Sequence, residues 1–308
     1  IAFMLRSIEI GRAAMEPCQR IERSIITKFR KPIWGGFMHG LREYRLIQPG
    51  DHIAACISGG KDSFLMAKCL QEVQRHGDVP FQLSFLVMDP GYHPQNRRLI
   101  EENAALLELP IQIFETDIFE AVSHMEHAPC YMCARMRRGY LYKHAQRLGA
   151  NKIALGHHFD DVIETVLLSM FYGGEMKTMM PRLRSQNYPG MELIRPMYKV
   201  REKDIIAWKQ YNHLTFLNCA CRFTESCASG EGNGSKRAEV KALIAQLART
   251  NPLLESNIFR SCHDVNLKTV VGYIQEGVHH PYDEHLFTGE NTGETGSSAT
   301  GTPVDTDD

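Results

Sequence analysis

The residues best suited to chemistry on an anion form the loop Ser58–Ser63, with the sequence SGGKDS. The loop follows an apolar run that predicts a buried strand and precedes a run with helical spacing. Gly59 and Gly60 let backbone amides approach an anion, and the start of the helix adds N–H groups that lack intrahelical acceptors. The serine hydroxyls and the Lys61 ammonium add further donors. A tight turn capped by Asp62 would explain part of the pattern, but the whole string favours a phosphate-binding loop.

Two other segments place polar side chains at the same edge of the predicted sheet. Asp89 ends the second apolar strand, and Gly156–Asp161, with the sequence GHHFDD, follows a later strand and opens a helix. Ligands of open parallel sheets bind at the carboxyl ends of the strands. The aspartates of GHHFDD could serve only as helix caps, but beside SGGKDS a role with a nucleotide and Mg²⁺ is equally supported. The predicted nucleotide site therefore also includes Asp89, Gly156, His157, Asp160 and Asp161.

The nine cysteines form the second chemical signal. An odd number in a chain that opens without a signal-peptide pattern argues against a disulfide framework and favours metal ligation or thiol chemistry. Cys130 and Cys133 form a Cys-x-x-Cys turn before a helix whose start and arginines favour thiolates. Cys219 and Cys221 offer two more sulfurs, with Cys227 further along. A structural four-thiolate zinc site is the alternative, although a Cys-x-Cys pair is tighter than the usual zinc spacing.

These segments lie in an alternation of strands and helices, and the other four cysteines read as small buried hydrophobes (Cys18, Cys56, Cys69 and Cys262). Strands are predicted at residues 52–57, 81–88, 111–114, 152–155 and 193–196. Helices are predicted at residues 62–76, 95–107, 134–148, 160–172, 201–211, 235–249 and 266–275. The order predicts an α/β fold with a parallel sheet covered by helices on both faces, extended by helical N- and C-terminal additions.

We expect four segments along the chain. Residues 1–50 read as an amphipathic helix and a basic linker, because Pro32 and the pair Gly35-Gly36 end the helical pattern. Residues 51–230 form the domain with the phosphate loop and the cysteines, and residues 231–287 form a C-terminal helical segment. Residues 288–308 are acidic and have few apolar side chains to bury, so we expect them to be disordered.

The distribution of apolar and charged residues along the chain indicates which partners, membrane or polyanion, the protein could bind. No run approaches the roughly 20 apolar residues that span a bilayer, and charged residues stand where a signal peptide has its apolar core. We therefore expect a cytoplasmic protein without membrane contact. The formal net charge is −1, but all 35 bases and 28 of the 36 acids lie within residues 1–268, a charge of +7 for that part. A polyanionic partner is therefore permitted, and its candidate phosphate contacts are Arg135, Arg137, Arg138, Lys177, Arg182, Arg184 and Lys199.

These strings together resemble one family. SGGKDS lacks the Walker spacing and resembles the PP-loop of ATP pyrophosphatases, which cleave ATP between the α and β phosphates. The ordered set SGGKDS, PCYMCARMRRGYLY, KIALGHHFDD, MFYGGEMK and RPMYKVREKDI, followed by the late cysteine pair, covers about residues 20–230. This set resembles the tRNA 2-thiocytidine synthetase family (TtcA).

The resemblance implies an ATP-dependent tRNA sulfurtransferase. In that family a cytosine at position 32 of tRNA is adenylated at O2 with ATP and Mg²⁺, and sulfide on the open iron of a 4Fe-4S cluster then displaces AMP. It implies catalytic roles for Lys61, Asp62 and Asp161, a sulfur donor such as a cysteine desulfurase, and a homodimer. The chain departs from the family at the expected third cluster ligand, because the family's late motif is Cys-x-x-Cys and this chain has Cys219-x-Cys221.

The expected cluster ligands are Cys130, Cys133 and Cys221, with Cys219 as the competing third ligand. Two alternative functions stay open. Another PP-loop tRNA enzyme, such as a 2-thiouridine or lysidine synthetase, is the nearest one. Thiouridine synthetases of the related type flank this domain with paired zinc knuckles, and this chain has only Cys18 before residue 56. A zinc-braced, non-catalytic RNA-binding module is the alternative of a different class.

Overall fold

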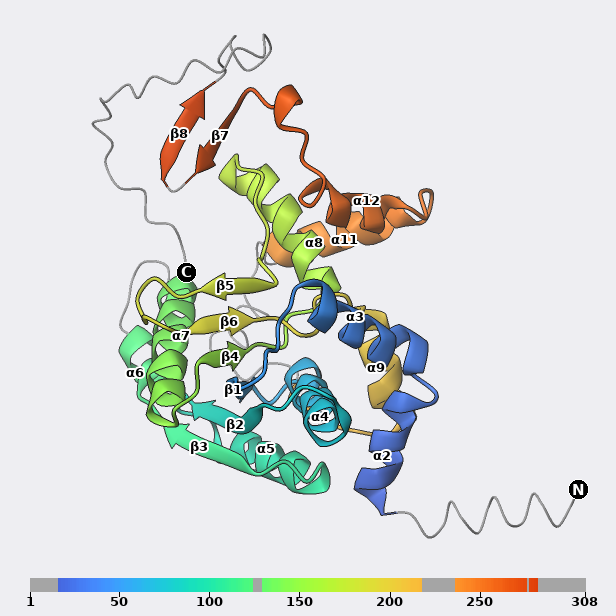
Figure 1. The fold of residues 1–308 in the computed structure, drawn as a ribbon, viewed down its shortest axis with the longest axis vertical. Coiled ribbons are helices and arrows are strands. Elements are labelled where there is room, and N and C mark those ends of the chain that lie inside the picture. The colour runs from blue at the N-terminus through green and yellow to red at the C-terminus, as the bar shows by residue number, and fades with distance from the viewer. Residues whose placement is uncertain (1–15, 124–128, 218–235, 276, 282–308) are drawn as a thin grey trace, which may run out of the picture.

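The computed structural model describes residues 16–123, 129–217, 236–275 and 277–281, and its centre is a six-stranded sheet (Figure 1). The strands lie in the order β3-β2-β1-β4-β6-β5. All neighbouring pairs are parallel except β5 and β6, which are antiparallel at one edge. The strands are β1 (His52–Ile57), β2 (Gln82–Asp89), β3 (Ile111–Glu115), β4 (Lys152–Ala154), β5 (Arg182–Arg184) and β6 (Glu192–Ile194).

Helices cover both faces of the sheet, which confirms the predicted α/β fold (Figure 1). Strand β1 is buried on both sides, since Ile53 and Ala55 join one apolar core and Ala54 and Cys56 join the other. On the first face lie α4 (Lys61–His76), α5 (Pro94–Leu106) and α9 (Glu202–Tyr211). On the second face lie α6 (Ile118–Ser123) and α7 (Pro129–Arg147).

The amino-terminal segment is helical beyond the point where the sequence predicted a linker. Helix α2 (Pro17–Ile26) is followed by a π-helix, η1 (Arg30–Gly35), and then by α3 (Gly36–Glu43). Pro32 lies in the first turn of η1, where a backbone N–H has no intrahelical acceptor to lose. A Cβ on Gly36 would lie 2.9 Å from the carbonyl oxygen of Lys199, so this glycine permits close packing rather than ending a helix.

The cysteine-bearing helix starts earlier than predicted. Helix α7 begins at Pro129, and Cys130 and Cys133 are therefore its second and fifth residues and do not lie in a preceding loop. Proline is favoured at the first position of a helix because it has no N–H to leave unsatisfied there. Of the cysteines predicted to be buried, Cys18, Cys56 and Cys69 are buried and Cys262 is partly exposed.

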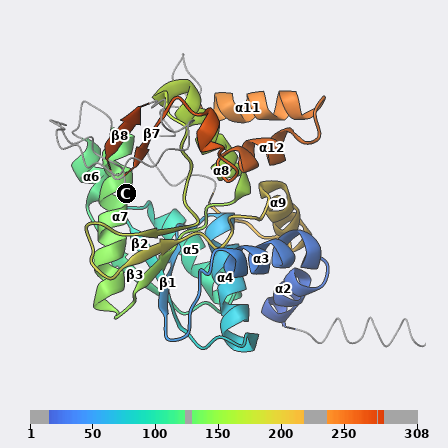
Figure 2. The same cartoon turned by 45° about the horizontal axis from the view of Figure 1, so that its top comes forward.

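The carboxy-terminal part packs on α8 (Phe159–Leu168), which continues as a π-helix, η2 (Ser169–Gly173). Helices α11 (Lys236–Ala248) and α12 (Leu254–Ser261) share an apolar cluster with α8 that contains Ile163, Val240 and Ile244. Figure 2 shows these helices above the carboxyl edge of the sheet. Among the described residues, no helix has the length and apolar character needed to cross a membrane.

The prediction of a helix at residues 266–275 is wrong. The structure has a short 3-10 turn, η3 (Leu267–Thr269), and an antiparallel hairpin of β7 (Gly272–Gln275) and β8 (Val278–Pro281). The run from Thr269 to Val271 is β-branched, which favours an extended backbone, and Gly272 is a poor helix former. Strand β5 was also missed, because it holds a single apolar residue between two arginines.

Candidate nucleotide and cysteine site

The loop Ser58–Ser63 joins β1 to α4 at the carboxyl edge of the sheet, as predicted. Gly59 has φ +91°, a backbone conformation that favours glycine. The Ser58 amide donates to Ser63 Oγ at 3.1 Å, and Ser63 Oγ donates to the Gly60 carbonyl at 3.0 Å. Gly60 caps α4 without any side-chain hydrogen bond to the helix start. The first amides of α4 therefore keep their capacity to bind an anion.

The GHHFDD segment packs directly against this loop. A Cβ on Gly156 would lie 2.9 Å from the Ser63 nitrogen and 3.1 Å from the Asp62 carbonyl carbon. Glycine is thus required for the two motifs to approach each other. His158 Nε2 lies 3.8 Å from Asp62 Oδ1, so side chains of the two motifs also face each other.

The two aspartates of GHHFDD both have structural partners. Asp161 Oδ2 accepts from the His158 amide at 3.0 Å, and its own amide donates to His158 Nδ1, which completes a capping box at the start of α8. Asp160 accepts from the Glu202 amide at 2.6 Å and from Arg201 Nη2 at 3.1 Å. The helix-capping interpretation therefore describes the contacts of Asp161 at the start of α8, whereas Asp160 holds Arg201 and the first amide of α9.

Lys61 and Asp62 are the two charged residues of the loop, and both side chains are largely shielded from solvent. Lys61 Nζ lies 3.2 Å from Asp62 Oδ2 and 3.1 Å from Glu202 Oε1. Burial would lower the pKa of Lys61, but these carboxylates outweigh it and raise the pKa. Burial raises the pKa of Asp62, whose Oδ1 is buried without a hydrogen-bond partner. A buried acceptor of this kind fits a bound cation or a donor from a ligand.

His157 brings another unsatisfied polar atom to the edge. Its Nδ1 is buried and has no hydrogen-bond partner, and the same holds for Nε of Arg138 on α7. Burial, assisted by the positive charge of Arg195, lowers the pKa of His157 to about 4. His157 is therefore neutral at physiological pH, and its Nδ1 can donate or accept one hydrogen bond, depending on the tautomer.

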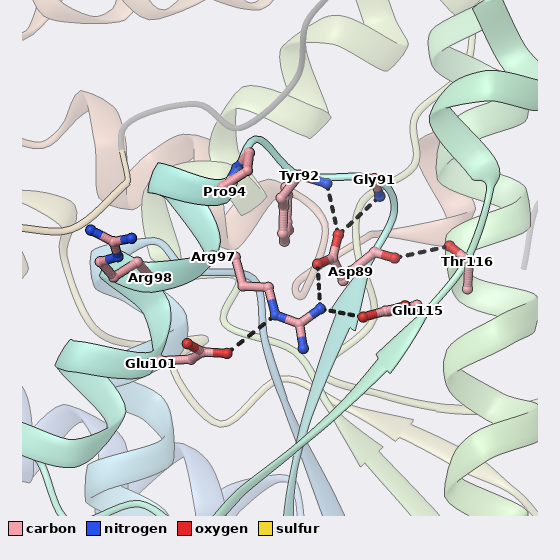
Figure 3. Close-up of a pocket in the computed structure, with 9 residues that line it drawn as sticks. All are labelled: Asp89, Gly91, Tyr92, Pro94, Arg97, Arg98, Glu101, Glu115 and Thr116. Carbon is pink, nitrogen blue, oxygen red and sulfur yellow. Dashed lines mark hydrogen bonds and ion pairs between the residues drawn. The ribbon is translucent and has the colours of Figure 1, made fainter.

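Asp89 shapes the turn after β2 (Figure 3). Its Oδ1 accepts from the amides of Gly91 at 2.9 Å and Tyr92 at 2.7 Å, and Oδ2 lies 3.2 Å from Arg97 Nη1. Arg97 is also held by Glu115. These residues line a pocket of about 480 Å³, whose full lining is Asp89, Gly91, Tyr92, Pro94, Arg97, Arg98, Glu101, Glu115 and Thr116.

Tyr92 connects the phosphate loop to the cysteine-bearing helix. Its hydroxyl donates to the Ser58 carbonyl at 3.4 Å. Burial raises the pKa of Tyr92, and the Arg137 guanidinium opposes that shift. Cys133 of α7 packs against the apolar cluster that contains Tyr92. Cys133 is half-buried and packs against the core around Met88. No pattern in the sequence indicates this role for Tyr92.

Leu217 anchors the chain to the phosphate loop just before the late cysteines. Its amide donates to the Gly59 carbonyl at 3.1 Å, and its side chain fills the space where a Cβ on Gly59 would lie. Cys219 and Cys221 follow in sequence, but they lie outside the described residues, as does Cys227 and the side chain of Cys130. Within the described residues no group of three His, Cys, Asp or Glu side chains could hold a metal ion.

Several of the predicted phosphate contacts already have acidic partners. Arg182 lies 2.8 Å from Glu192, Lys177 lies 3.2 Å from Glu175, and Lys199 pairs with Glu43. Arg184 and Arg135 are exposed. Arg182 is a poor candidate for an RNA contact, because its partner lies on the neighbouring strand β6 and is largely shielded from solvent.

Comparisons with known proteins settle the family. A family model described as a PP-loop domain matches residues 37–221, more than half of the chain. The chain belongs to the PP-loop family. It is 36% identical over 240 residues to a tRNA-cytidine(32) 2-sulfurtransferase of Shewanella amazonensis, covering 76% of this chain and 72% of the relative. With the same-named protein of Photobacterium profundum it shares 34% identity over 247 residues, or 78% of each chain.

These relatives place the chain among the tRNA-cytidine(32) 2-sulfurtransferases of the PP-loop family, as the sequence motifs predicted. Among solved structures, the U34-tRNA thiolase NcsA from Methanococcus maripaludis, with its [4Fe-4S] cluster, has a TM-score of 0.60 and 19% sequence identity. The match covers 78% of this chain and 82% of NcsA. At this identity the likeness shows a shared PP-loop fold.

Proposed function

We propose that this PP-loop protein is an ATP-dependent tRNA sulfurtransferase that replaces the 2-oxygen of a cytosine with sulfur. The names of its relatives, tRNA-cytidine(32) 2-sulfurtransferase, support both the base and its position. The observation that carries the proposal is the position of Tyr92, whose hydroxyl donates to the carbonyl of Ser58 and whose apolar cluster packs against Cys133 of α7. A nucleotide loop and a cysteine site that share one edge suit activation and sulfur transfer on the same base.

The phosphate loop fits ATP as a substrate. The uncapped start of α4, Lys61 and the two serine hydroxyls would bind the β and γ phosphates. The O2 atom of the cytosine would attack the α phosphorus, so that an O–P bond forms, pyrophosphate leaves and its charge stays on these donors. Adenylation turns O2 into a good leaving group, and sulfide attack at C2 would then expel AMP with the C–O electron pair.

Among the aspartates of the site, Asp62 fits a Mg²⁺ ion best. It has a buried carboxylate oxygen without a hydrogen-bond partner, whereas Asp89, Asp160 and Asp161 are engaged by backbone amides and arginines. Oxygen ligands of this type are those that Mg²⁺ prefers. We therefore propose Asp62 as the Mg²⁺ ligand. The other three aspartates hold the loops and helices of the site in position.

The residues around α7 suit an iron-sulfur cluster. Cys130 and Cys133 are three positions apart among the first five residues of α7, a spacing that puts both on one face of the helix where the helix start favours thiolates. Leu217 holds the chain at the phosphate loop shortly before Cys219 and Cys221. We propose Cys130, Cys133 and Cys221 as ligands of a 4Fe-4S cluster, which when bound supplies the sulfide.

The remaining assignments follow from the same proposal. Residues 51–230 form the catalytic domain, flanked by residues 1–50 and 231–287, with 288–308 as an acidic tail. The partners are tRNA and a sulfur donor such as a cysteine desulfurase, the working form is a homodimer, and the compartment is the cytoplasm. The pocket beside Asp89 lies at the edge where the adenosine part of ATP would enter.

Mass spectrometry of tRNA nucleosides tests the proposal. Cells that lack the protein are complemented with the wild type or with Lys61→Ala, and 2-thiocytidine is measured. We expect 2-thiocytidine only with the wild type. Loss of 2-thiouridine or lysidine would assign the chain to another PP-loop tRNA enzyme. An unchanged nucleoside profile would favour the zinc-braced RNA-binding module, and metal analysis after anaerobic purification would then show zinc in place of iron.

A further inference from the structure

We propose that helix α11 takes part in ATP binding through Lys241. Glu202 competes with the phosphates of ATP for Lys61. Lys241, on α11, keeps its ion pair with Glu202 once Lys61 has turned to a phosphate. The inference rests on the proposed binding of ATP to Ser58–Ser63. It gives Glu202 and Lys241 a positioning role that neither the PP-loop motifs nor the family match assigns.

Glu202 stands between two lysines from distant parts of the chain. Its Oε1 lies 3.1 Å from Nζ of Lys61 at the start of α4, and its Oε2 lies 2.5 Å from Nζ of Lys241 on α11. The side chains of Lys61 and Glu202 are 21% and 19% exposed. This shielding makes their interaction less screened by solvent than a surface ion pair.

The charge of Glu202 depends on both lysines. Burial alone would raise its pKa, but hydrogen bonds from Lys241 and Lys61 outweigh burial and lower the pKa to about 2. A shielded carboxylate that lost both partners would be strongly unfavourable. When Lys61 turns to a phosphate, Lys241 is therefore the group that keeps Glu202 satisfied next to the added negative charge.

Other contacts hold α11 and α12 in place behind the GHHFDD segment. Arg237 of α11 lies 3.3 Å from Asp161 and 3.0 Å from Glu164. On α12, Glu255 lies 2.5 Å from Arg201, which also pairs with Asp160. The apolar cluster shared with α8 adds to this docking. The carboxy-terminal helices thus contact Asp161 directly and reach Lys61 through Glu202.

The arrangement predicts effects of opposite sign on ATP affinity. Removing the carboxylate in Glu202→Gln frees Lys61, so ATP should bind more tightly, by about fivefold. Removing the second lysine in Lys241→Met leaves Lys61 as the sole partner of Glu202, so ATP should bind about fivefold more weakly. In the double variant no carboxylate is stranded, and its affinity should match that of Glu202→Gln.

The test is calorimetric titration of the full chain with ATP and Mg²⁺ in the absence of RNA. Lys236→Met is the matched control, because Lys236 lies on the same helix but faces the ring of Tyr172. It should bind ATP like the wild type. Lys241 is 54% exposed, so its loss should be tolerated, and melting temperatures would verify that all variants fold.

Hydrogen exchange of residues 236–248 provides a second readout. By reciprocity, a helix that favours ATP binding is itself stabilised by ATP, so amide exchange of α11 should slow when ATP is added to the wild type. The effect should vanish in Lys241→Met. Weaker ATP binding by Glu202→Gln, or wild-type affinity in Lys241→Met, would overturn the inference. A wild-type chain that binds no ATP would instead refute the proposed function.

Discussion

At the scale of single residues, Lys61 gives the most direct test of the phosphate loop. Lys61→Ala removes a shielded ammonium, and charge-assisted hydrogen bonds to phosphate contribute about 1.5 to 3 kcal/mol each. We expect the ATP dissociation constant to rise by about 10- to 100-fold. Folding should change little, because Glu202 keeps Lys241 as a partner.

Calorimetric titration with ATP and a thermal melt would measure both effects in the same sample. Lys236→Ala serves as the control for loss of a lysine outside the loop. An unchanged ATP affinity in Lys61→Ala would mean that the SGGKDS loop is only a structural turn.

The burial of His157 should make the stability of the protein depend on pH. Its pKa of about 4 in the folded chain lies below the ordinary value of 6.5, mainly because of burial. Between these values the unfolded state binds more protons than the folded state, so the free energy of unfolding falls as the pH drops from 6.5 towards 4. Above pH 6.5 the contribution of the neutral His157 to the free energy of unfolding is fully present. His157→Gln should flatten this part of the profile.

Urea denaturation at pH 7.5 and pH 5.0 checks the sign for the wild type and His157→Gln. His76→Gln is the control, because the His76 side chain is 73% exposed. Equal losses of stability in the wild type and His157→Gln on acidification would show that His157 is not held neutral.

The site residues that were predictable are those carried by local patterns. Ser58–Ser63 and Gly156–Asp161 stand out because a strand end, glycines and a helix start occur together in the sequence. Tyr92, Glu202 and Leu217 were missed, because their roles depend on which segments the fold brings together. The double glycine beside Pro32 was misread for the same reason, since the contact that requires Gly36 is the carbonyl of Lys199.

At the scale of elements, the central strands were predicted closely because burial on both faces leaves an uninterrupted apolar run. The strand at 52–57 matches its predicted bounds, and β2 is displaced by one residue. The edge strand β5 could not be seen, because its position depends on Arg182 pairing with Glu192 across to β6. Propensity alone decides little in such short segments.

The approach of two elements leads to a prediction for Gly156. In Gly156→Ala the added Cβ would lie 2.9 Å from the Ser63 nitrogen, and backbone atoms cannot yield as a flexible side chain can. We expect a loss of about 1 to 3 kcal/mol in stability. ATP affinity should fall as well, because the start of α4 must move away from α8.

Gly173→Ala is the matched control, since a Cβ there meets no atom within 4 Å. Urea denaturation and ATP titration of the two variants would be compared. If Gly156→Ala behaved like Gly173→Ala, close packing of the two motifs would not matter for the nucleotide site.

At the scale of the whole molecule, both terminal additions are attached to the helices that begin at the two nucleotide motifs. Helix α2 reaches α4 through the fully buried Lys68, whose Nζ lies 2.5 Å from Glu22 and 2.7 Å from the Leu107 carbonyl. Helix α11 reaches α8 through Arg237. The additions therefore brace the nucleotide motifs from opposite ends of the chain.

The last prediction concerns the cysteines that are proposed to hold the cluster. If three cysteines hold a 4Fe-4S cluster with one open iron, then Cys130→Ala, Cys133→Ala and Cys221→Ala should each lose iron and thiolation activity. Cys56→Ala and Cys262→Ala should lose neither, because Cys56 is buried in β1 and Cys262 ends α12. Iron analysis after anaerobic purification measures the first effect.

ATP binding should survive in all five variants, since the phosphate loop contains none of these cysteines. Cys219→Ala then decides the third ligand. Iron retained in that variant supports Cys221, whereas iron lost there but retained in Cys221→Ala would exchange the two assignments. Loss of iron in both would indicate four cysteine ligands and no open iron, which would leave no position for sulfide and favour a structural or redox role for the metal.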